Sequence, residues 1–390
     1  MRKLTKSFLL MSGAALAVSA GMATADVAAP AAVKAMSEYP PLANLGPVPV
    51  PDDNKMSDAK VELGKILFWD PRIGGDASTA CVTCHEPDQG WGFNDSISRG
   101  YPGTVHWRNS QTVINTAYLG QLFWAGSARS LEKQAPSAAK GAVAGNGEND
   151  VMETRMAFIP EYVTRFKDVF GTEYPLIDDA WRAIAAFERT LIVNDTPVDK
   201  YLAGDTSALT EEQVAGMELF NGKAGCIQCH NGSLTTDENY YNLGVPPVER
   251  WEDDGLAQVT FRYEIYSKGV TQDLYRKLKD DPGLYFRTKE KEHMGKFRTA
   301  PLRYTMYTAP YMHNGAFWDL REVVEFYNAG GGENDFTDGT IASTKSNLLK
   351  PLNLSEDEID QLVAFLEGFS GDELRIEPPV LPPYEALASE

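Results

Sequence analysis

The chain contains two copies of the pattern Cys-x-x-Cys-His, and together they use all four of its cysteines. The pattern is typical of c-type haem attachment, in which two thiols bind one haem and the adjacent histidine binds its iron. A zinc ribbon would have its two Cys-x-x-Cys pairs about 15–20 residues apart, far closer than here. A thioredoxin-like motif explains neither the histidine nor the duplication. The sequence therefore predicts two covalently bound haem c groups, at Cys81, Cys84 and His85 and at Cys226, Cys229 and His230.

The first 25 residues have the features of an exported leader. Arg2, Lys3 and Lys6 precede an apolar stretch from Phe8 to Val18, and the small residues Ala23-Thr24-Ala25 follow. The apolar stretch is too short to span a membrane, and no later stretch is apolar enough to do so. We therefore expect a signal peptide, residues 1–25, cleaved after Ala25, and a periplasmic protein without a membrane span.

The chain is acidic, with 55 Asp and Glu against 36 Lys and Arg and a formal net charge of −19. This balance argues against nucleic acid as a partner, because nucleic-acid binding relies on basic surfaces. A negative surface would attract a basic electron-transfer protein, but it would equally serve solubility. The composition does not choose between these two interpretations.

Apolar spacing and capping signals predict a mainly helical protein. Ser57 is expected to cap one helix, and Thr210 with Gln213 forms a capping box for another. Each of these helices precedes one of the haem motifs. Two more amphipathic helices are expected after Asp319 and after Ser355. No stretch has a convincing strand pattern.

The two halves of the chain resemble each other. The stretch from Arg108 to Gly126 aligns with that from Arg298 to Gly315, so that Trp124 and His313 occupy roughly equivalent places. We therefore predict two cytochrome c-like domains, each with one covalently attached haem. The predicted divisions after the leader are an N-terminal arm (26–55), an N-terminal domain (56–205), a C-terminal domain (206–376) and an extended tail (377–390). Residues 232–296 of the second half have no counterpart in the first and form a long insertion.

Further motifs accompany the haem motifs in a fixed order. They are Arg108-Asn109, Phe123-Trp124-Ala125-Gly126, Ser130-Leu131-Glu132-Lys133-Gln134, Thr308-Ala309-Pro310-Tyr311-Met312-His313-Asn314-Gly315 and Glu322-Val323-Val324-Glu325-Phe326-Tyr327. With this combination, the chain resembles the bacterial dihaem cytochrome c peroxidase superfamily, which includes the methylamine-utilisation protein MauG. The resemblance extends over nearly the whole chain after the leader.

The resemblance implies different roles for the two haems. In the family, the N-terminal haem reacts with peroxide, the C-terminal haem passes electrons, and a calcium ion lies between them. Asn109 matches the calcium-binding asparagine, while Thr308 and Pro310 match positions that offer backbone carbonyls to calcium. Trp124 matches the tryptophan between the haems, where it would relay electrons. From the residues alone, Trp124 is a buried core indole, an interpretation that is compatible with the relay role.

The identity of the sixth ligand at the second iron affects its chemistry, because axial ligands set iron reactivity. The position that carries methionine in the peroxidases of the family falls on Tyr327, on the apolar face of a predicted helix. MauG-like proteins have tyrosine there, so Tyr327 is the predicted ligand. Its phenolate would be a hard anionic donor that favours high-valent iron. The alternative is that Tyr327 is a core residue and that Met294, Met306 or Met312 binds the iron.

At the first haem, we expect His85 on one side of the iron and an open position on the other. Many peroxidases of the family have a second histidine there at rest. His106 is the only histidine in the right region, but it lies closer to Asn109 than the family's capping histidine does. It is therefore expected to be a pocket or surface residue.

Cleavage of peroxide needs a base that moves its proton, and the family uses a glutamate helped by a glutamine. Gln134 matches the glutamine. The position of the glutamate is Ala144, in a lengthened Gly-rich segment. Glu148 is therefore the predicted replacement, with Glu153 as the next candidate.

Together, these features predict a periplasmic dihaem c-type peroxidase that reacts with hydrogen peroxide at the His85 haem. Its electron donor would be a small redox protein (a cytochrome c or a cupredoxin) or a protein substrate oxidised at its own side chains. MauG has a surface tryptophan two residues before its second haem motif, where this chain has Ala224, so a different protein substrate is expected. The alternative is a non-enzymatic dihaem electron-transfer cytochrome c.

Overall fold

A computed structural model describes residues 35–101, 103–249, 253–278, 280–333 and 343–384. The predicted signal peptide, residues 26–34 of the predicted arm and the last six residues of the predicted tail lie outside the described residues. From Ala35 onward the chain forms one compact unit. Within the described ranges, no helix is long and apolar enough to cross a membrane.

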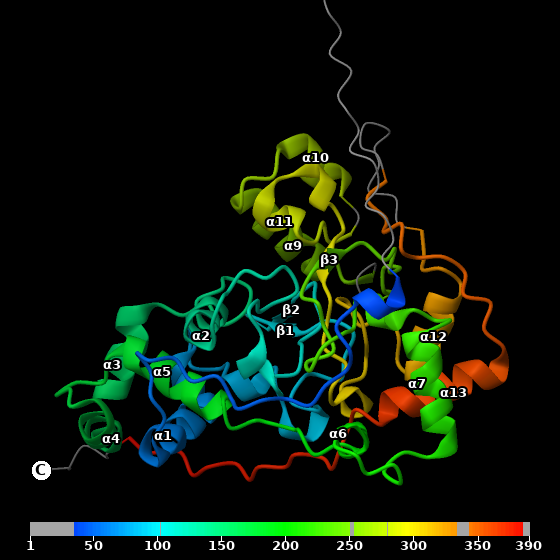
Figure 1. The fold of residues 1–390 in the computed structure, drawn as a ribbon. Coiled ribbons are helices and arrows are strands. Elements are labelled where there is room, and N and C mark those ends of the chain that lie inside the picture. Colours follow the sequence, from blue (N-terminus) through cyan, green and yellow to red (C-terminus); the bar gives the residue numbers. More distant parts are fainter. Residues whose placement is uncertain (1–34, 102, 250–252, 279, 334–342, 385–390) are drawn as a thin grey trace, which may run out of the picture. The chain divides into compact units, whose positions relative to one another are not determined.

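The protein is mainly helical, as predicted (Figure 1). Among the described residues, the α-helices are α1 (Asp58–Trp69), α2 (Leu131–Ala139), α3 (Asn149–Ala157), α4 (Pro160–Phe170), α5 (Ile177–Glu188), α6 (Pro197–Leu202), α7 (Glu211–Asn221), α9 (Gly255–Ser267), α10 (Gln272–Lys277), α11 (Tyr285–Thr288), α12 (Leu320–Asn328) and α13 (Glu356–Glu367). Two antiparallel pairs of two-residue strands accompany them: β1 (Arg99–Gly100) with β2 (Thr104–Val105), and β3 (Tyr240–Tyr241) with β4 (Phe297–Arg298).

The predicted helix starts are confirmed. The Ser57 hydroxyl accepts a hydrogen bond from the backbone N–H of Lys60, which begins α1. Thr210 and Gln213 form the reciprocal capping box of α7. Asp319 and Ser355 likewise cap α12 and α13. Local side-chain chemistry therefore fixes where the helices around both haem motifs begin.

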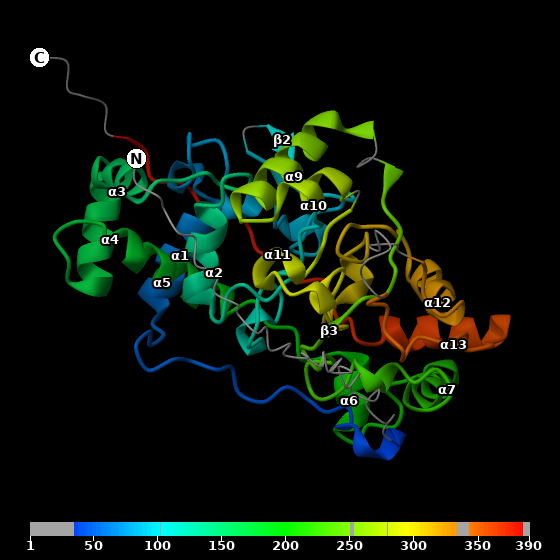
Figure 2. The ribbon, with the colours of Figure 1, turned by 90° about the horizontal axis from the view of Figure 1, so that it is seen from above.

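The same helix crossing occurs in both halves. In one, α1 packs on α5, and in the other, α7 packs on α13 (Figures 1 and 2). At each crossing the first helix has a glycine where the two backbones are too close for a side chain. A Cβ on Gly64 would lie 1.9 Å from the carbonyl oxygen of Ala183, and one on Gly216 would lie 1.9 Å from that of Gln361. This pairing agrees with the internal repeat seen in the sequence.

Two main clusters of buried side chains follow these two crossings. One includes Phe68 and Phe187, and Cys81 packs against it. The other includes Phe220 and Phe365, and Cys226 packs against it. Each haem motif therefore has its own hydrophobic core, although the predicted domain boundary near residue 206 stays a prediction.

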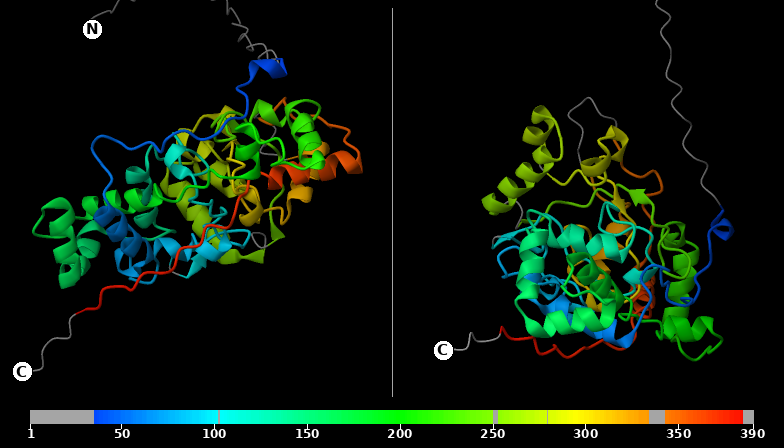
Figure 3. Two further views of the ribbon diagram at one scale, coloured as in Figure 1. Left: turned by 60° about the horizontal axis from the view of Figure 1, so that its bottom comes forward. Right: turned by 90° about the vertical axis from the view of Figure 1, so that its left-hand side faces the viewer.

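The C-terminal segment returns to the first of these cores. After α13 it runs without helix or strand toward α1 (Figures 1 and 3), and Leu374, Ile376 and Leu381 pack against the first cluster. The indole N–H of Trp91 donates to the carbonyl of Leu374 at 2.8 Å. The end of the described chain thus completes the core of its first half.

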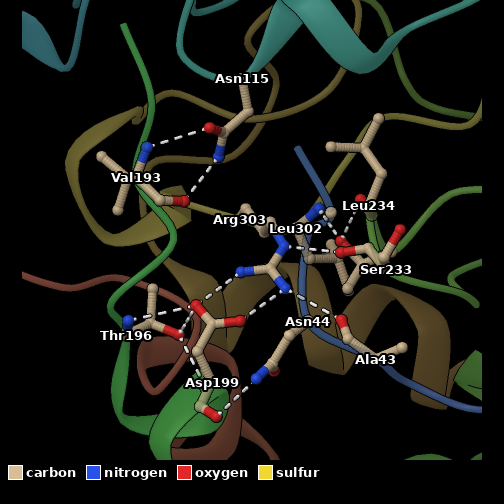
Figure 4. Close-up of polar contacts among 12 residues, drawn as sticks. Ala43, Asn44, Asn115, Val193, Thr196, Asp199, Ser233, Leu234, Leu302 and Arg303 are labelled. Atoms are coloured by element: carbon tan, nitrogen blue, oxygen red, sulfur yellow. Dashed lines mark hydrogen bonds and ion pairs between the residues drawn. The ribbon is translucent and has the colours of Figure 1, made fainter. Parts of the chain in front are cut away.

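A buried ion pair connects the arm, α6 and the loop after the second haem motif (Figure 4). The guanidinium of Arg303 donates to both carboxylate oxygens of Asp199 at 2.8 Å, to the carbonyl of Ser233 at 2.7 Å and to that of Ala43 at 3.1 Å. The hydroxyl of Thr196 also donates to Asp199, at 2.8 Å.

The predicted insertion packs against the first half of the chain. Its helix α9 lies beside β2 (Figure 2). Phe261 of α9 joins a third buried cluster with Ile97, Val105 and Trp107, and its ring makes an edge contact with Trp107 at 5.6 Å between centroids. The insertion therefore supports the β1–β2 hairpin, which follows the first haem motif.

Candidate dihaem site

Each haem motif begins with a short 3₁₀ helix, η3 (Cys81–Thr83) or η6 (Cys226–Gln228). The turn closes at the histidine: the N–H of His85 donates to the carbonyl of Cys81 at 3.1 Å, and that of His230 to Cys226 at 2.9 Å. All four cysteines are free thiols. The two motifs thus present the same backbone turn, with both sulfurs available for thioether bonds.

The two motif histidines are held in the same way. Nδ1 of His85 lies 3.3 Å from the carbonyl oxygen of Trp91, and Nδ1 of His230 lies 3.2 Å from that of Thr235. A carbonyl only accepts, so Nδ1 carries the proton and Nε2 is free to bind a metal. Burial also lowers the pKa of both imidazoles, which favours their neutral, ligating form.

One continuous cavity of about 910 Å³ joins both motifs. It is lined by all four cysteines, by His85 and by His230. Its volume is near the upper end of the range for cofactor and ligand sites, about 300–1,000 Å³. The free thiols, the histidine tautomers and the cavity all fit two covalently attached haems, which would supply the redox chemistry of the site.

The cavity brings together most of the residues that the sequence singled out. Its lining includes Asn109, Trp124, Gln134, Thr308, Pro310 and Tyr327. His106, Met312 and Ala144 line it too, whereas Met294 and Met306 do not. The prediction from motif order thus holds for the location of these side chains, although their roles stay predictions.

The two glutamates predicted to act on peroxide lie elsewhere. Glu148 is exposed and precedes α3, and the carboxylate of Glu153 accepts a hydrogen bond from the backbone N–H of Ile177 at 2.9 Å. Neither residue lines the cavity. The structure does not bring Glu148 to the site, because its loop turns outward before α3 begins.

A buried carboxyl that sequence reasoning missed, Glu188, lines the cavity at the end of α5. It is 3 % exposed, and its Oε2 has no hydrogen-bond partner among the described residues. Burial raises its pKa to about 8; Arg189 lowers and Glu132 raises it by smaller amounts. The internal repeat could have pointed to this residue. When the two helix crossings are aligned, Glu188 of α5 takes the position of Leu366 of α13, so a carboxyl replaces an apolar side chain that also lines the cavity.

Glu188→Gln is expected to make the protein's stability less dependent on pH. The pKa of this carboxyl is raised from 4.5 to about 8 on folding, so the unfolded chain releases the proton first and stability falls as pH rises from about 4.5 to 8. The amide would remove this cost, of the order of 4 kcal/mol at pH 8. Thermal unfolding at pH 5 and pH 8 tests this, and an equal shift at both values would contradict it.

Trp124 and His313 lie close together in the cavity wall, at equivalent turns of the two halves. Phe123 and Met312, which precede them, both have positive φ, of 66° and 73°. The Trp124 indole donates to the carbonyl of Asn109 at 2.9 Å, and its ring makes an edge contact with the His313 imidazole at 6.5 Å between centroids. The predicted equivalence of Trp124 and His313 is confirmed.

The Tyr327 side chain reaches the cavity from α12. Burial raises the pKa of its hydroxyl, and negative charge on Cys229 and Cys226 would raise this pKa further. Because such an effect needs short distances, the hydroxyl lies near the two cysteines of the second haem motif. Among the residues that the structure describes, none forms a hydrogen bond with this hydroxyl.

These features define a c-type cytochrome with two haem sites, and comparison with known proteins agrees. A family model described as di-haem cytochrome c peroxidase matches residues 58–207. The chain is 52% identical to the cytochrome-c peroxidase IdrP1 of Pseudomonas sp. (strain SCT), over 98% of this chain and 96% of that protein. It is 32% identical to the methylamine utilization protein MauG of Methylorubrum extorquens, over 96% of each.

The fold is also similar to a solved structure. The crystal structure of a MauG-like protein associated with microbial copper homeostasis matches with a TM-score of 0.70 and 26% identity, over 84% of this chain and 93% of that one. The chain belongs to the di-haem cytochrome c peroxidase and MauG family. It is an enzyme of the cytochrome-c peroxidase type, with two c-type haems and with hydrogen peroxide as the acceptor.

Proposed function

We propose that this enzyme is a periplasmic, MauG-like dihaem peroxidase. Cys81, Cys84 and His85 would hold the haem that supplies the reaction with hydrogen peroxide. Cys226, Cys229, His230 and Tyr327 would hold a second haem, which would share the oxidising equivalents. The observation that carries the proposal is the Tyr327 side chain, which lines the cavity beside the second haem motif. Its hydroxyl has no hydrogen-bond partner among the described residues and is free to bind a metal.

The methionine alternatives have less support. Met294 is fully buried in the cluster that holds the insertion, and Met306 is 44 % exposed; neither lines the cavity. Met312 does line it, but this residue precedes His313 at the turn equivalent to Phe123. Tyr327 is therefore the ligand that we propose.

Trp124 is the proposed relay between the two haems. Its indole lies in the wall of the shared cavity, and its hydrogen bond to Asn109 fixes the orientation of the ring. A fixed aromatic ring between two redox centres shortens each electron-transfer step. Gln134 of α2, which also lines the cavity, is the proposed polar partner of peroxide.

A calcium ion is proposed close to Trp124. Asn109 uses its amide nitrogen to donate to the carbonyls of Phe93 and Asp95, which leaves its side-chain oxygen free. In the described part of the chain, the carbonyls of Thr308 and Pro310 accept no hydrogen bond. Three such oxygens, completed by water, suit calcium. Metal analysis of the purified protein before and after chelation would test this site.

The electron donor that we propose is a protein. A small cytochrome c or a cupredoxin is one form of it, and the names of the IdrP1 relatives favour a cytochrome. Tyr327 favours the other form, a protein substrate oxidised at its own side chains. Because Ala224 stands where MauG has a surface tryptophan, this substrate would differ from that of MauG.

Adding one equivalent of hydrogen peroxide to the fully oxidised protein tests the proposal. We expect an immediate and persistent change in the absorption spectrum, because the first iron would have an open position and would need no prior reduction. A reaction that begins only after one haem is reduced would instead indicate a capped peroxidase. A protein that stays entirely low-spin and unreactive in every oxidation state would be an electron carrier, which would overturn the proposal.

A further inference from the structure

The peroxide site of this chain lacks the carboxylate that the resemblance leads one to expect. Ala144 lines the cavity at that position and offers only a methyl group. The predicted replacements, Glu148 and Glu153, lie outside the cavity. Gln134 of α2 remains as one polar partner of peroxide, and the place of the missing carboxylate is open to a polar group from another part of the chain.

The β1–β2 hairpin brings such a group to Ala144. The N–H of Tyr101 donates to the carbonyl of Val143 at 2.9 Å. A Cβ placed on Gly100 would lie 2.8 Å from that same oxygen and 3.3 Å from the backbone nitrogen of His106. His106 follows β2, and its side chain lines the cavity. The backbone of His106 therefore lies close to the segment that holds Ala144, and both residues line the cavity.

This region belongs to the first haem motif. The N–H of His106 donates to the carbonyl of Ser98 at 2.8 Å. Arg99, which follows Ser98, has its carbonyl oxygen 3.8 Å from the sulfur of Cys84. The hairpin thus connects His106 to the first haem attachment site rather than to the second.

The tautomer of His106 is opposite to that of the two motif histidines. Its Nδ1 accepts a hydrogen bond from the backbone N–H of Arg108 at 3.1 Å. In the neutral ring the proton is therefore on Nε2, which is suited to donate a hydrogen bond and not to bind iron. Among the described residues, none accepts a hydrogen bond from this Nε2.

The surroundings of His106 fix its ring and keep it neutral. It stacks on the indole of Trp107, with 4.0 Å between centroids and 19° between planes, and Trp107 is itself held by Phe261 and Phe286. Burial lowers the pKa of His106 to about 3, with Arg108 lowering and Asp281 raising it by smaller amounts. At neutral pH the imidazole is an uncharged donor in a fixed position.

We propose that Nε2–H of His106 is the hydrogen-bond donor that binds and orients hydrogen peroxide beside Ala144. This inference rests on the proposed reaction of peroxide at the His85 haem. The peroxide oxygen accepts the hydrogen bond and His106 keeps its proton, so the residue orients the substrate and is neither an iron ligand nor a base.

The test compares His106→Leu, which removes the donor, with His106→Gln, which retains an N–H. Cyanide, a small anion, serves as a probe whose binding to the oxidised protein is followed by absorption. We expect His106→Leu to weaken cyanide binding and to slow the bimolecular reaction with peroxide by about 10- to 100-fold each, the usual effect of losing a hydrogen bond to a charged or strongly polar group. His106→Gln is expected to recover most of both.

Two further variants sharpen the comparison. His293→Leu removes a histidine that lies outside the cavity and is hydrogen-bonded to Thr288, and it should change neither measurement. Adding Ala144→Glu to His106→Leu returns a polar group to the same region and should restore the peroxide rate.

Unchanged cyanide affinity and peroxide rate in a folded His106→Leu protein would overturn the inference. So would a change from low-spin to high-spin haem in that variant, because it would make His106 an iron ligand. Loss of the peroxide reaction in Glu188→Gln, with His106→Leu unaffected, would assign the role to Glu188. A wild-type protein that does not react with peroxide would refute the proposed function alone, while cyanide affinity would still decide the role of His106.

Discussion

Replacing Tyr327 with methionine is expected to raise the reduction potential of the second haem by hundreds of millivolts. A phenolate is anionic and stabilises oxidised iron, whereas a thioether is neutral and soft and stabilises reduced iron. Axial ligands set the reduction potentials of haem proteins over a range of about 0.8 V, so exchanging this donor should shift the potential by a large part of that range. Spectroelectrochemical titration of the two haems measures the change.

The control for this substitution separates ligand exchange from a loss of packing. Tyr327→Phe keeps the ring and removes the oxygen, so it should free the iron position without creating the high-potential site. Met312→Leu removes the methionine that shares the cavity and should leave the second haem unchanged. An unaltered spectrum and potential in Tyr327→Met would show that Tyr327 is not the ligand.

Arg303→Met is expected to lower the free energy of unfolding by about 3–5 kcal/mol, the usual cost of breaking a buried ion pair. Arg303 and Asp199 are each 3 % exposed, and the substitution leaves the Asp199 carboxylate buried without its cation. The same change removes the hydrogen bonds to Ser233 and Ala43. Denaturant unfolding of the haem-loaded protein measures the effect.

Arg321 offers a matched control on the surface. Its guanidinium contacts three carboxylates, those of Glu325, Glu356 and Asp360, whereas Arg303 contacts one. Because this group is partly exposed and its charge is screened by water, Arg321→Met should lower the free energy of unfolding far less than Arg303→Met does. Equal losses in the two variants would mean that burial does not govern the strength of these ion pairs.

Those parts of the fold that depend on neighbouring residues were predictable from the sequence. Ser57 and Thr210 cap their helices through side chains three residues from their partners, so the pattern alone indicates both starts. The haem motifs are equally local, because five consecutive residues supply the thiols and the histidine. The equivalence of Trp124 and His313 followed from the repeat.

Other parts depend on contacts between residues far apart in the sequence. Glu153 holds the first turn of α5 through Ile177, which removes it from the candidate acids. Glu188 enters the cavity only because α5 crosses α1 at Gly64. The position of His106 depends on the β1–β2 hairpin, which the insertion supports through Phe261 and Trp107. No spacing rule reports such contacts, so predicting the peroxide-binding group from the sequence led to Glu148.

The path of the C-terminal segment has a consequence for the order in which the chain can fold. Trp91 and Leu374 are 283 residues apart, yet they share a hydrogen bond, and Tyr304 also joins the first core. Closing so long a loop is entropically costly and comes late in folding. During synthesis the first half emerges long before the residues that complete its core. The core of the first half is therefore complete only once nearly the whole polypeptide has emerged, so its last contacts form after those of the second half can begin.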